Sequence, residues 1–218
     1  MTKQEILSAF HFRHACKEFD RSKIIPKDDF EFILETARLS PSSYGLEPWH
    51  FVVVQDKNLR EQLKSCAWGA LLKLDTASHF VLCLTMKQPL MKWDSDYIPR
   101  FMRAVQHMPE DVIKMRCELI ENTQKYDSDL LDERKLFDWT SKQSFIAMGN
   151  MMTAAAMIGI DSCPIGGFKQ EETEALLQSA FAIDTKLYGI SYMLAFGYRL
   201  HAPKTKTRRP IEEVVSWK

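Results

Sequence analysis

The chain has 218 residues, of which 45% are hydrophobic and 27% are charged, as is usual for a globular protein. Its 29 basic and 29 acidic residues give a net charge of +0, which argues against a broad cationic surface for nucleic acid. Five widely spaced cysteines without a CxxC pair argue against a disulfide framework or a zinc site. No signal-like segment opens the sequence and no run reaches the ~18 apolar residues of a membrane span, so we expect a cytoplasmic protein with no nucleic-acid or membrane partner.

Apolar periodicity predicts two helices near the amino terminus, at residues 3–10 and 27–39. Arg13 and Lys17 follow the first of them, and their spacing of four residues predicts that they share a helical face. A helix at this place would set two cations side by side.

Two short apolar segments predict β-strands, at residues 50–54 and 80–85. The second is apolar at nearly every position, which favours a buried central strand. Asp56 is a suitable N-cap for a helix between the two strands.

The segment from about residue 88 to residue 140 departs from this pattern. It is polar, it is interrupted by prolines and it is rich in aromatic residues. We interpret it as an excursion from the core, either a lid over a site or an ordinary helical appendage.

The last third of the chain returns to regular apolar segments. Residues 143–158 are apolar on nearly every face, which predicts a helix that is buried all round, within one subunit or between two. A helix at about 171–181 and a buried strand at 190–197 follow, and residues 211–215 could extend a sheet edge. Interspersed helices and strands without a regular βαβ repeat predict the α+β class.

The sequence lacks the familiar motifs of hydrolases and nucleotide-binding proteins. It contains no GxSxG, HExxH, Walker-type or GxGxxG pattern. His11 and His14 form a close pair, but no carboxylate or thiolate partner stands at a convincing spacing, so we expect no metal site.

Fixed cations and flexible turns are the remaining candidates for chemistry. Lys206, Arg208 and Arg209 form a second basic cluster, far in sequence from the first. The two clusters are either solvated charge patches or two halves of a phosphate site, for which the planar fork of arginine is suited. The turn at residues 40–44 offers hydroxyls and free amides, and the glycine pair at 166–167 lets the backbone approach a flat ligand.

Five stretches in this order resemble the FMN-dependent nitroreductase family over essentially the whole chain. They are RHACKEFD at residues 13–20, SPSSYGLEPWHF at 40–51, KLDTASH at 73–79, PIGGF at 164–168 and KTRRP at 206–210. The resemblance implies a single domain with a nitroreductase-like three-layer fold, in which helices flank a central mixed, mostly antiparallel sheet. It also implies an intertwined homodimer with two sites at the subunit interface.

The same resemblance implies an enzyme of the oxygen-insensitive type. NADH or NADPH would reduce bound FMN, and nitroaromatics, quinones or similar acceptors would then be reduced by a ping-pong mechanism. The alternatives on this scaffold are a flavin reductase, a dihydropteridine reductase, a reductive dehalogenase, or a non-catalytic flavin-binding redox sensor. The sequence does not decide between NADH and NADPH, nor does it give the physiological acceptor.

Around the flavin ring, the resemblance implies no catalytic side chain, because flavin N5 is itself the reactive atom. Lys17 and Lys73 would lie near the N1/O2 edge, where negative charge develops on reduction. Residues 164–167 would line the N5 side, while Tyr126 and Phe168 would shape substrate access.

At the other end of the cofactor, the resemblance places Arg13, Lys206 and Arg208 at the FMN phosphate. Ser42 and Ser43 would reach it from the partner subunit. The implied cofactor-binding residues are Arg13, His14, Ala15, Lys17, Pro41, Ser42, Ser43, Gly45, Lys73, Pro164, Ile165, Gly166, Gly167, Lys206 and Arg208.

Three positions depart from the family pattern. Gly166 stands where many members carry a glutamate near N5, Gly45 stands where asparagine is common, and Ala15 replaces a frequent serine beside the phosphate. The first difference bears on acceptor preference and the third removes one phosphate contact. None of them removes the cations.

Overall fold

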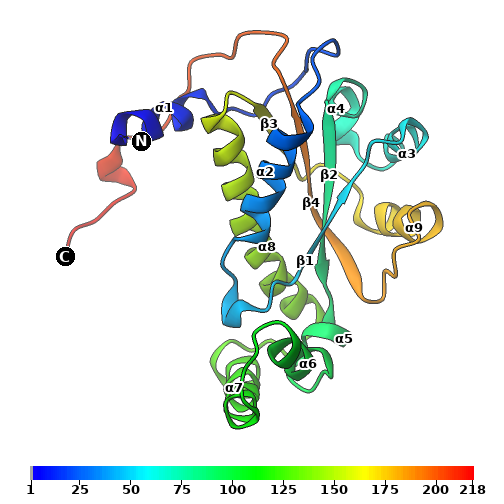
Figure 1. The fold of residues 1–218 in the computed structure, drawn as a ribbon, viewed down its shortest axis with the longest axis vertical. Coiled ribbons are helices and arrows are strands. Elements are labelled where there is room, and N and C mark those ends of the chain that lie inside the picture. Colours follow the sequence, from blue (N-terminus) through cyan, green and yellow to red (C-terminus); the bar gives the residue numbers. More distant parts are fainter. Residues whose placement is uncertain (1) are drawn as a thin grey trace.

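One antiparallel sheet organises the computed structural model, which describes residues 2–218 (Figure 1). The strands, in the order β1-β2-β4-β3, are β1 (Trp49–Val53), β2 (His79–Met86), β4 (Tyr188–Gly197) and β3 (Asp161–Ile165). All three pairings are antiparallel, with His79 opposite Phe196 and Asp161 opposite Gly197. The predicted central strand is confirmed, since every residue of β2 after His79 is buried.

Helices cover both faces of the sheet and so produce three layers (Figure 1). On one face, α2 (Lys27–Arg38) and α8 (Glu133–Met157) pack against each other and share a core cluster with the strands. The opposite face is covered by α3 (Lys57–Leu63), α4 (Leu71–Thr76) and α9 (Gln170–Ala180). The α+β class and the three-layer arrangement are therefore confirmed.

Three further helices lie together beyond one end of the sheet, at the bottom of Figure 1. They are α5 (Gln88–Met91), α6 (Tyr97–Ala104) and α7 (Glu110–Asn122), and a π-helical turn at Thr123–Asp127 follows. They share an apolar cluster with Met86 of β2 and Leu136 of α8, and Ile98 is fully buried in it.

Local sequence explains where several helices begin and end. A capping box opens α1 (Lys3–Phe12), and the predicted cap Asp56 accepts hydrogen bonds from the first backbone amides of α3. Asp132 caps α8 in the same way. Gly159, with φ +77°, ends α8 in the left-handed conformation that glycine adopts most easily.

The expected shared helical face of Arg13 and Lys17 is wrong. α1 ends before Arg13, which is an extended C-cap with ψ 127°. Residues beyond it run alongside β3 instead: Ala15 forms a parallel bridge with Ser162, and the Cys16 amide donates to the Ser162 carbonyl (3.1 Å). Pairing with a distant strand therefore overrides the local helical spacing.

α8 also differs from the prediction. It begins at Glu133 rather than at residue 143, so the excursion ends earlier than expected. One face of α8 is open within the chain, because Phe145, Ile146 and Met157 are each at least 40% exposed. Neither α8 nor any other helix within residues 2–218 combines the length and apolar character needed to cross a membrane.

Two features of the carboxyl-terminal half were not expected. The tail forms a short 3-10 helix at Ile211–Glu213 and does not join the sheet. β3 was missed because it starts with the polar residues Asp161 and Ser162 and contains Pro164, which breaks a strand-like pattern.

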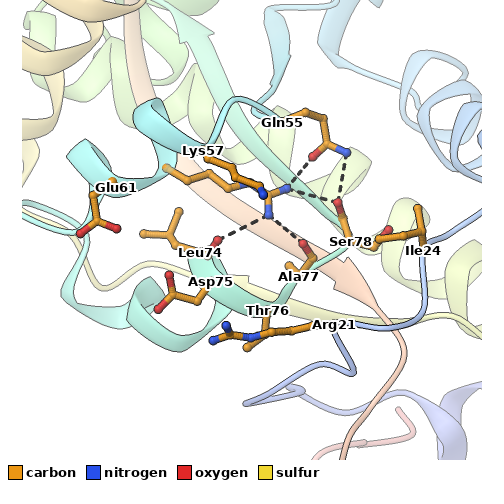
Figure 2. A pocket seen from close by; sticks show the side chains of 11 residues that line it. Arg21, Ile24, Gln55, Lys57, Glu61, Leu74, Asp75, Thr76, Ala77 and Ser78 are labelled. Atoms are coloured by element: carbon orange, nitrogen blue, oxygen red, sulfur yellow. Dashed lines mark hydrogen bonds between the residues drawn. The ribbon is translucent and has the colours of Figure 1, made fainter.

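Arg60 of α3 is half-buried and links α4 to the residue that follows β1. Figure 2 shows Gln55, Leu74, Ala77 and Ser78, which accept its hydrogen bonds. The five N–H groups of Arg60 donate to the carbonyls of Val54 (2.7 Å), Ala77 (2.7 Å), Ser78 (3.2 Å) and Leu74 (3.4 Å) and to Gln55 Oε1 (2.5 Å). Some of these carbonyl groups lie at the carboxyl end of α4, where the helix dipole favours a cation. No N–H of Arg60 is left for a ligand in the adjoining cavity of about 570 Å³, so we assign it a structural role.

We expect Arg60→Met to lower the free energy of unfolding by about 3 kcal/mol, because buried carbonyls lose a charged donor. Urea denaturation measures the change. Arg38→Met is the matched control, since Arg38 makes only an exposed pair with Glu35 and should cost less than about 0.5 kcal/mol. Equal losses in the two variants would contradict the structural role of Arg60.

Candidate functional site

Three predicted site residues from opposite ends of the chain meet at the end of α1. Lys206 Nζ donates to the carbonyls of Phe10 and Arg13, which lie 196 and 193 residues away in sequence. Burial and the positive charges of Arg13 and Arg208 lower the pKa of Lys206. Arg13, Lys206 and Arg208, hereafter the cation cluster, have no carboxylate within ion-pair distance among residues 2–218 and so suit an anion.

β3 carries the site away from the cation cluster. His14 Nδ1 lies 3.5 Å from Asp161 Oδ1, at the start of β3, and the next residue of each segment forms the parallel bridge. The segment at 13–17 thus runs beside the first residues of β3, and Phe19 then forms a bridge with Arg199, which follows β4. Five strand residues span about 17 Å, which is long enough for an elongated ligand with an anionic group at one end.

His14 is held in a group of charges that the sequence did not reveal. Arg199 donates from its backbone amide (2.9 Å) and from Nε (3.0 Å) to Asp161 Oδ2, and its guanidinium lies over the ring of Phe12. Neither Asp161 nor Arg199 was predicted, because both are close to His14 only through the sheet. Within residues 2–218, no group of three or more histidine, cysteine, aspartate or glutamate residues is placed to hold a metal.

Lys17 and Lys73 both act electrostatically on Cys163, the middle residue of β3. Burial raises the pKa of the Cys163 thiol, while the positive charges of Lys73 and Lys17 oppose this shift, so both ammonium groups lie close to Cys163. Lys73 Nζ is also held by the carbonyl of Gly69 (3.0 Å). Both predicted residues therefore act on the same thiol, one residue before the loop at 164–167.

The glycine loop is fixed by a second loop that the sequence analysis did not single out. The Gly69 amide donates to the Gly167 carbonyl (2.7 Å), and a Cβ on Gly69 would lie 3.0 Å from Gly167 Cα. The indole of Trp68, which is 67% exposed, covers Gly167. The adjacent residues Trp68 and Gly69 were a signal in the sequence from which this contact could have been predicted. Ile165 is buried, and its side chain belongs to the core.

The predicted serine turn is a strained, well-anchored element. Tyr44 and Gly45 have φ values of 57° and 65°. The Ser42 hydroxyl accepts from the Glu47 amide (2.9 Å), and the Ser43 amide donates to a glutamine of α8. Gln106, from beyond α6, donates to the carbonyls of Tyr44 (3.0 Å) and Gly45 (2.8 Å). The exposed Pro41 precedes the turn.

Within one chain, the serine turn is distant from the cation cluster. Ser43 is hydrogen-bonded to Gln143, whereas Phe12 of α1 lines a cavity together with Ala156. Thirteen residues separate Gln143 from Ala156 on α8, which corresponds to about 20 Å. Figure 1 shows the same separation, with the turn after α2 at one end of α8 and α1 at the other.

The two residues predicted to shape access have different environments. Tyr126 is 77% exposed and lies in the π-helical turn after α7, a type of distortion that is frequent at functional sites. Phe168 is half-buried and packs against the core, while its amide donates to the Gly166 carbonyl (3.2 Å).

The candidate site is thus a row of basic residues beside one strand of an α+β fold. Residues 11–198 match the family model described as the nitroreductase family. Putative NAD(P)H nitroreductase YfkO of Bacillus subtilis is 52% identical over 216 residues, which cover 99% of this chain and 98% of that protein. Putative NAD(P)H nitroreductase SERP2086 of Staphylococcus epidermidis is 49% identical over 98% and 97% of the two chains. The chain therefore belongs to the nitroreductase family.

Solved structures show the same fold. A putative NAD(P)H:FMN oxidoreductase from Staphylococcus epidermidis superposes with a TM-score of 0.80 at 24% identity, over 98% of this chain and 95% of that chain. A putative nitroreductase from Exiguobacterium sibiricum, solved in complex with FMN, gives a TM-score of 0.77 at 24% identity, over 100% and 98% of the two chains.

We expect Gly69→Ala to lower the free energy of unfolding by about 1–3 kcal/mol, because its Cβ would press on the backbone of Gly167. Thermal or urea unfolding measures the change. Gly166→Ala is the control, since nothing lies within 4 Å of its added Cβ. If both variants were equally stable, the tight pairing of the two loops would be incorrect.

Proposed function

We propose that the protein is an FMN-dependent oxidoreductase that uses NADH or NADPH to reduce nitroaromatics, quinones or similar acceptors by a ping-pong mechanism. The course of residues 13–17 along β3 is the observation that carries this proposal. It supports a site with the cation cluster beside the start of β3 and with Lys17 and Lys73 near Cys163, next to the loop at 164–167. The names of the curated relatives support the activity, and the FMN-bound neighbour supports the cofactor.

The residues present fit FMN at both of its ends. The cation cluster matches a phosphate, because its charges repel one another and have no carboxylate partner within residues 2–218. His14 Nδ1 is a buried polar atom without a hydrogen bond in the described structure. At the other end, nothing lies within 4 Å of a Cβ added to Gly166, so a flat ring could approach its backbone.

FMN, when bound, would supply the N5 atom that accepts and returns a hydride. The protein itself would bind FMN and polarise its ring. Lys17 and Lys73 would stabilise the negative charge that reduction places at the N1/O2 edge. Residues 164–167 would exclude water from one side of the ring and leave the other side to donor and acceptor in turn. No nucleophile is needed.

We infer a homodimer, because the serine turn and the cation cluster cannot reach one ligand end within a single chain. Ser42 and Ser43 would approach the cofactor of the partner subunit. Apolar surface that a second subunit could cover is exposed on α1, on α8 and on the tail, at Leu7, Phe10, Phe145, Ile146 and Trp217.

The helices beyond the sheet are proposed to control acceptor access. Met115, Leu119 and Tyr126 are exposed on α7 and on the turn that follows it. They would present an apolar, aromatic wall to flat acceptors, with Phe168 fixing the floor near Gly166. Five free cysteines suit a reducing compartment such as the cytoplasm.

An absorption spectrum of the purified protein, taken before and after anaerobic addition of NADH or NADPH, tests the proposed function. We expect a flavin spectrum that bleaches with at least one donor and recovers with a nitroaromatic or quinone acceptor. Sedimentation of the same sample should give about twice the chain mass of 25.3 kDa. A colourless protein that stays colourless after incubation with FMN and desalting would overturn the proposal.

Arg208→Ala should weaken FMN binding by about 10–100-fold and leave riboflavin binding unchanged, because a charge-assisted bond to phosphate is worth about 1.5–3 kcal/mol. Fluorescence titration with each flavin measures the change. Arg209→Ala is the matched control, since Arg208 and not its neighbour acts on Lys206. Equal losses for the two flavins would remove Arg208 from the phosphate site.

A further inference from the structure

Buried polar atoms without partners gather beside the cation cluster. Of the four side-chain atoms of this kind within residues 2–218, three are His14 Nδ1, Asp161 Oδ1 and Ser162 Oγ. The 3.5 Å between His14 Nδ1 and Asp161 Oδ1 is longer than a normal hydrogen bond. Arg199 Nη2 lies 2.6 Å from the same oxygen but is not aligned to donate to it. The imidazole therefore has a carboxylate within reach and no hydrogen bond to it.

Four elements present charge or dipole to His14. Asp161 comes from β3, Arg199 follows β4, Lys206 comes from the tail, and the Phe12 carbonyl ends α1. Burial, Arg199 and Lys206 lower the pKa of His14, while Asp161 and the Phe12 carbonyl oppose the shift. His14 is consequently neutral at pH 7 when the site holds no anion.

We propose that His14 gains a proton when a phosphate group enters the cation cluster, and so becomes an additional cation of the phosphate site. The inference rests on the proposed function, in which FMN supplies that phosphate. A dianion offsets the charges of Arg199 and Lys206, which disfavour the protonated ring. The charged ring can then donate from Nδ1 to Asp161, whose Oδ1 lacks an aligned donor.

The direction in which phosphate binding depends on pH follows from the difference in the pKa of His14 between the free and the phosphate-loaded protein. The pKa of His14 is lowered in the free protein and is higher in the phosphate-loaded protein. Phosphate binding therefore gains strength as the pH falls from the loaded pKa to the free pKa, by at most about tenfold per pH unit. The second ionisation of the phosphate itself, near pH 6, acts in the opposite direction, because the monoanion binds less well.

Calorimetry at pH 7 in two buffers of different ionisation enthalpy tests the proposal. The wild-type protein should take up protons on binding FMN and none on binding riboflavin. His14→Gln should show no uptake with either flavin. The ratio of FMN affinities, wild type over His14→Gln, should rise several-fold from pH 8 to pH 6. His11→Gln, which changes an exposed histidine of α1, is the matched control and should behave like the wild type.

FMN binding by the wild type without proton uptake would overturn the role of His14 and leave the proposed function intact. The same conclusion would follow if wild type and His14→Gln had equal pH dependence. Failure of the wild type to bind either flavin would instead overturn the proposed function, and this inference with it. If His14→Gln does not fold, His14→Asn takes its place, because the comparison with a His14 variant is what separates a proton taken up by His14 from one taken up by Lys206, whose pKa is also lowered.

Discussion

The site depends on one tertiary constraint, the pairing of residues 13–17 with β3. The backbone contacts are few: a bridge between Ala15 and Ser162 and the bond from the Cys16 amide to the Ser162 carbonyl. They hold the segment extended, so successive residues reach different points along the strand. A helix over the same residues would have placed Arg13 and Lys17 within one turn of each other. The extended segment instead places Arg13 in the cation cluster and Lys17 near Cys163, in the middle of β3.

That constraint explains how a short segment serves both ends of a long ligand. The His14 side of the segment meets Asp161 and the tail, while the Lys17 side meets Cys163 and Lys73. β3 can hold this segment because it is an edge strand of the sheet. Within the sheet it pairs with β4, on one side. Its other side is free to pair with residues 13–17, which also protects an edge that would otherwise be open.

Much of the scaffold could be predicted from local pattern. α2 and α3, the central strand β2 and the end of α8 all follow from periodicity, caps and glycine placement, which act within a few residues. The predictions that failed concern segments whose structure depends on contacts with residues distant in sequence. The extended segment after α1 needs β3, and β3 was itself hidden by Pro164. The open face of α8 looks the same in sequence as a buried one, because composition cannot show what a helix packs against.

For the site, the family resemblance supplied positions that local pattern could not. The structure brings together the cation cluster and, separately, places Lys17 and Lys73 within electrostatic range of Cys163. Asp161, Arg199, Trp68 and Gly69 were missed, because each acts through a neighbour that is remote in sequence. The serine turn illustrates the limit of a single chain: its hydroxyls lie about 20 Å along α8 from the residues they are proposed to complement.

Three cations held together without a counter-charge repel one another and destabilise the folded chain, and α1 offsets part of this effect. Lys206 donates to carbonyls near the carboxyl end of α1, where the helix dipole favours a positive charge. The cluster is thus arranged before any anion arrives, and an anion that binds only the folded chain stabilises it further. α1 also exposes Leu7 and Phe10. In the proposed dimer, the helix that holds the phosphate end would also be covered by the partner, so cofactor binding and subunit association would strengthen each other.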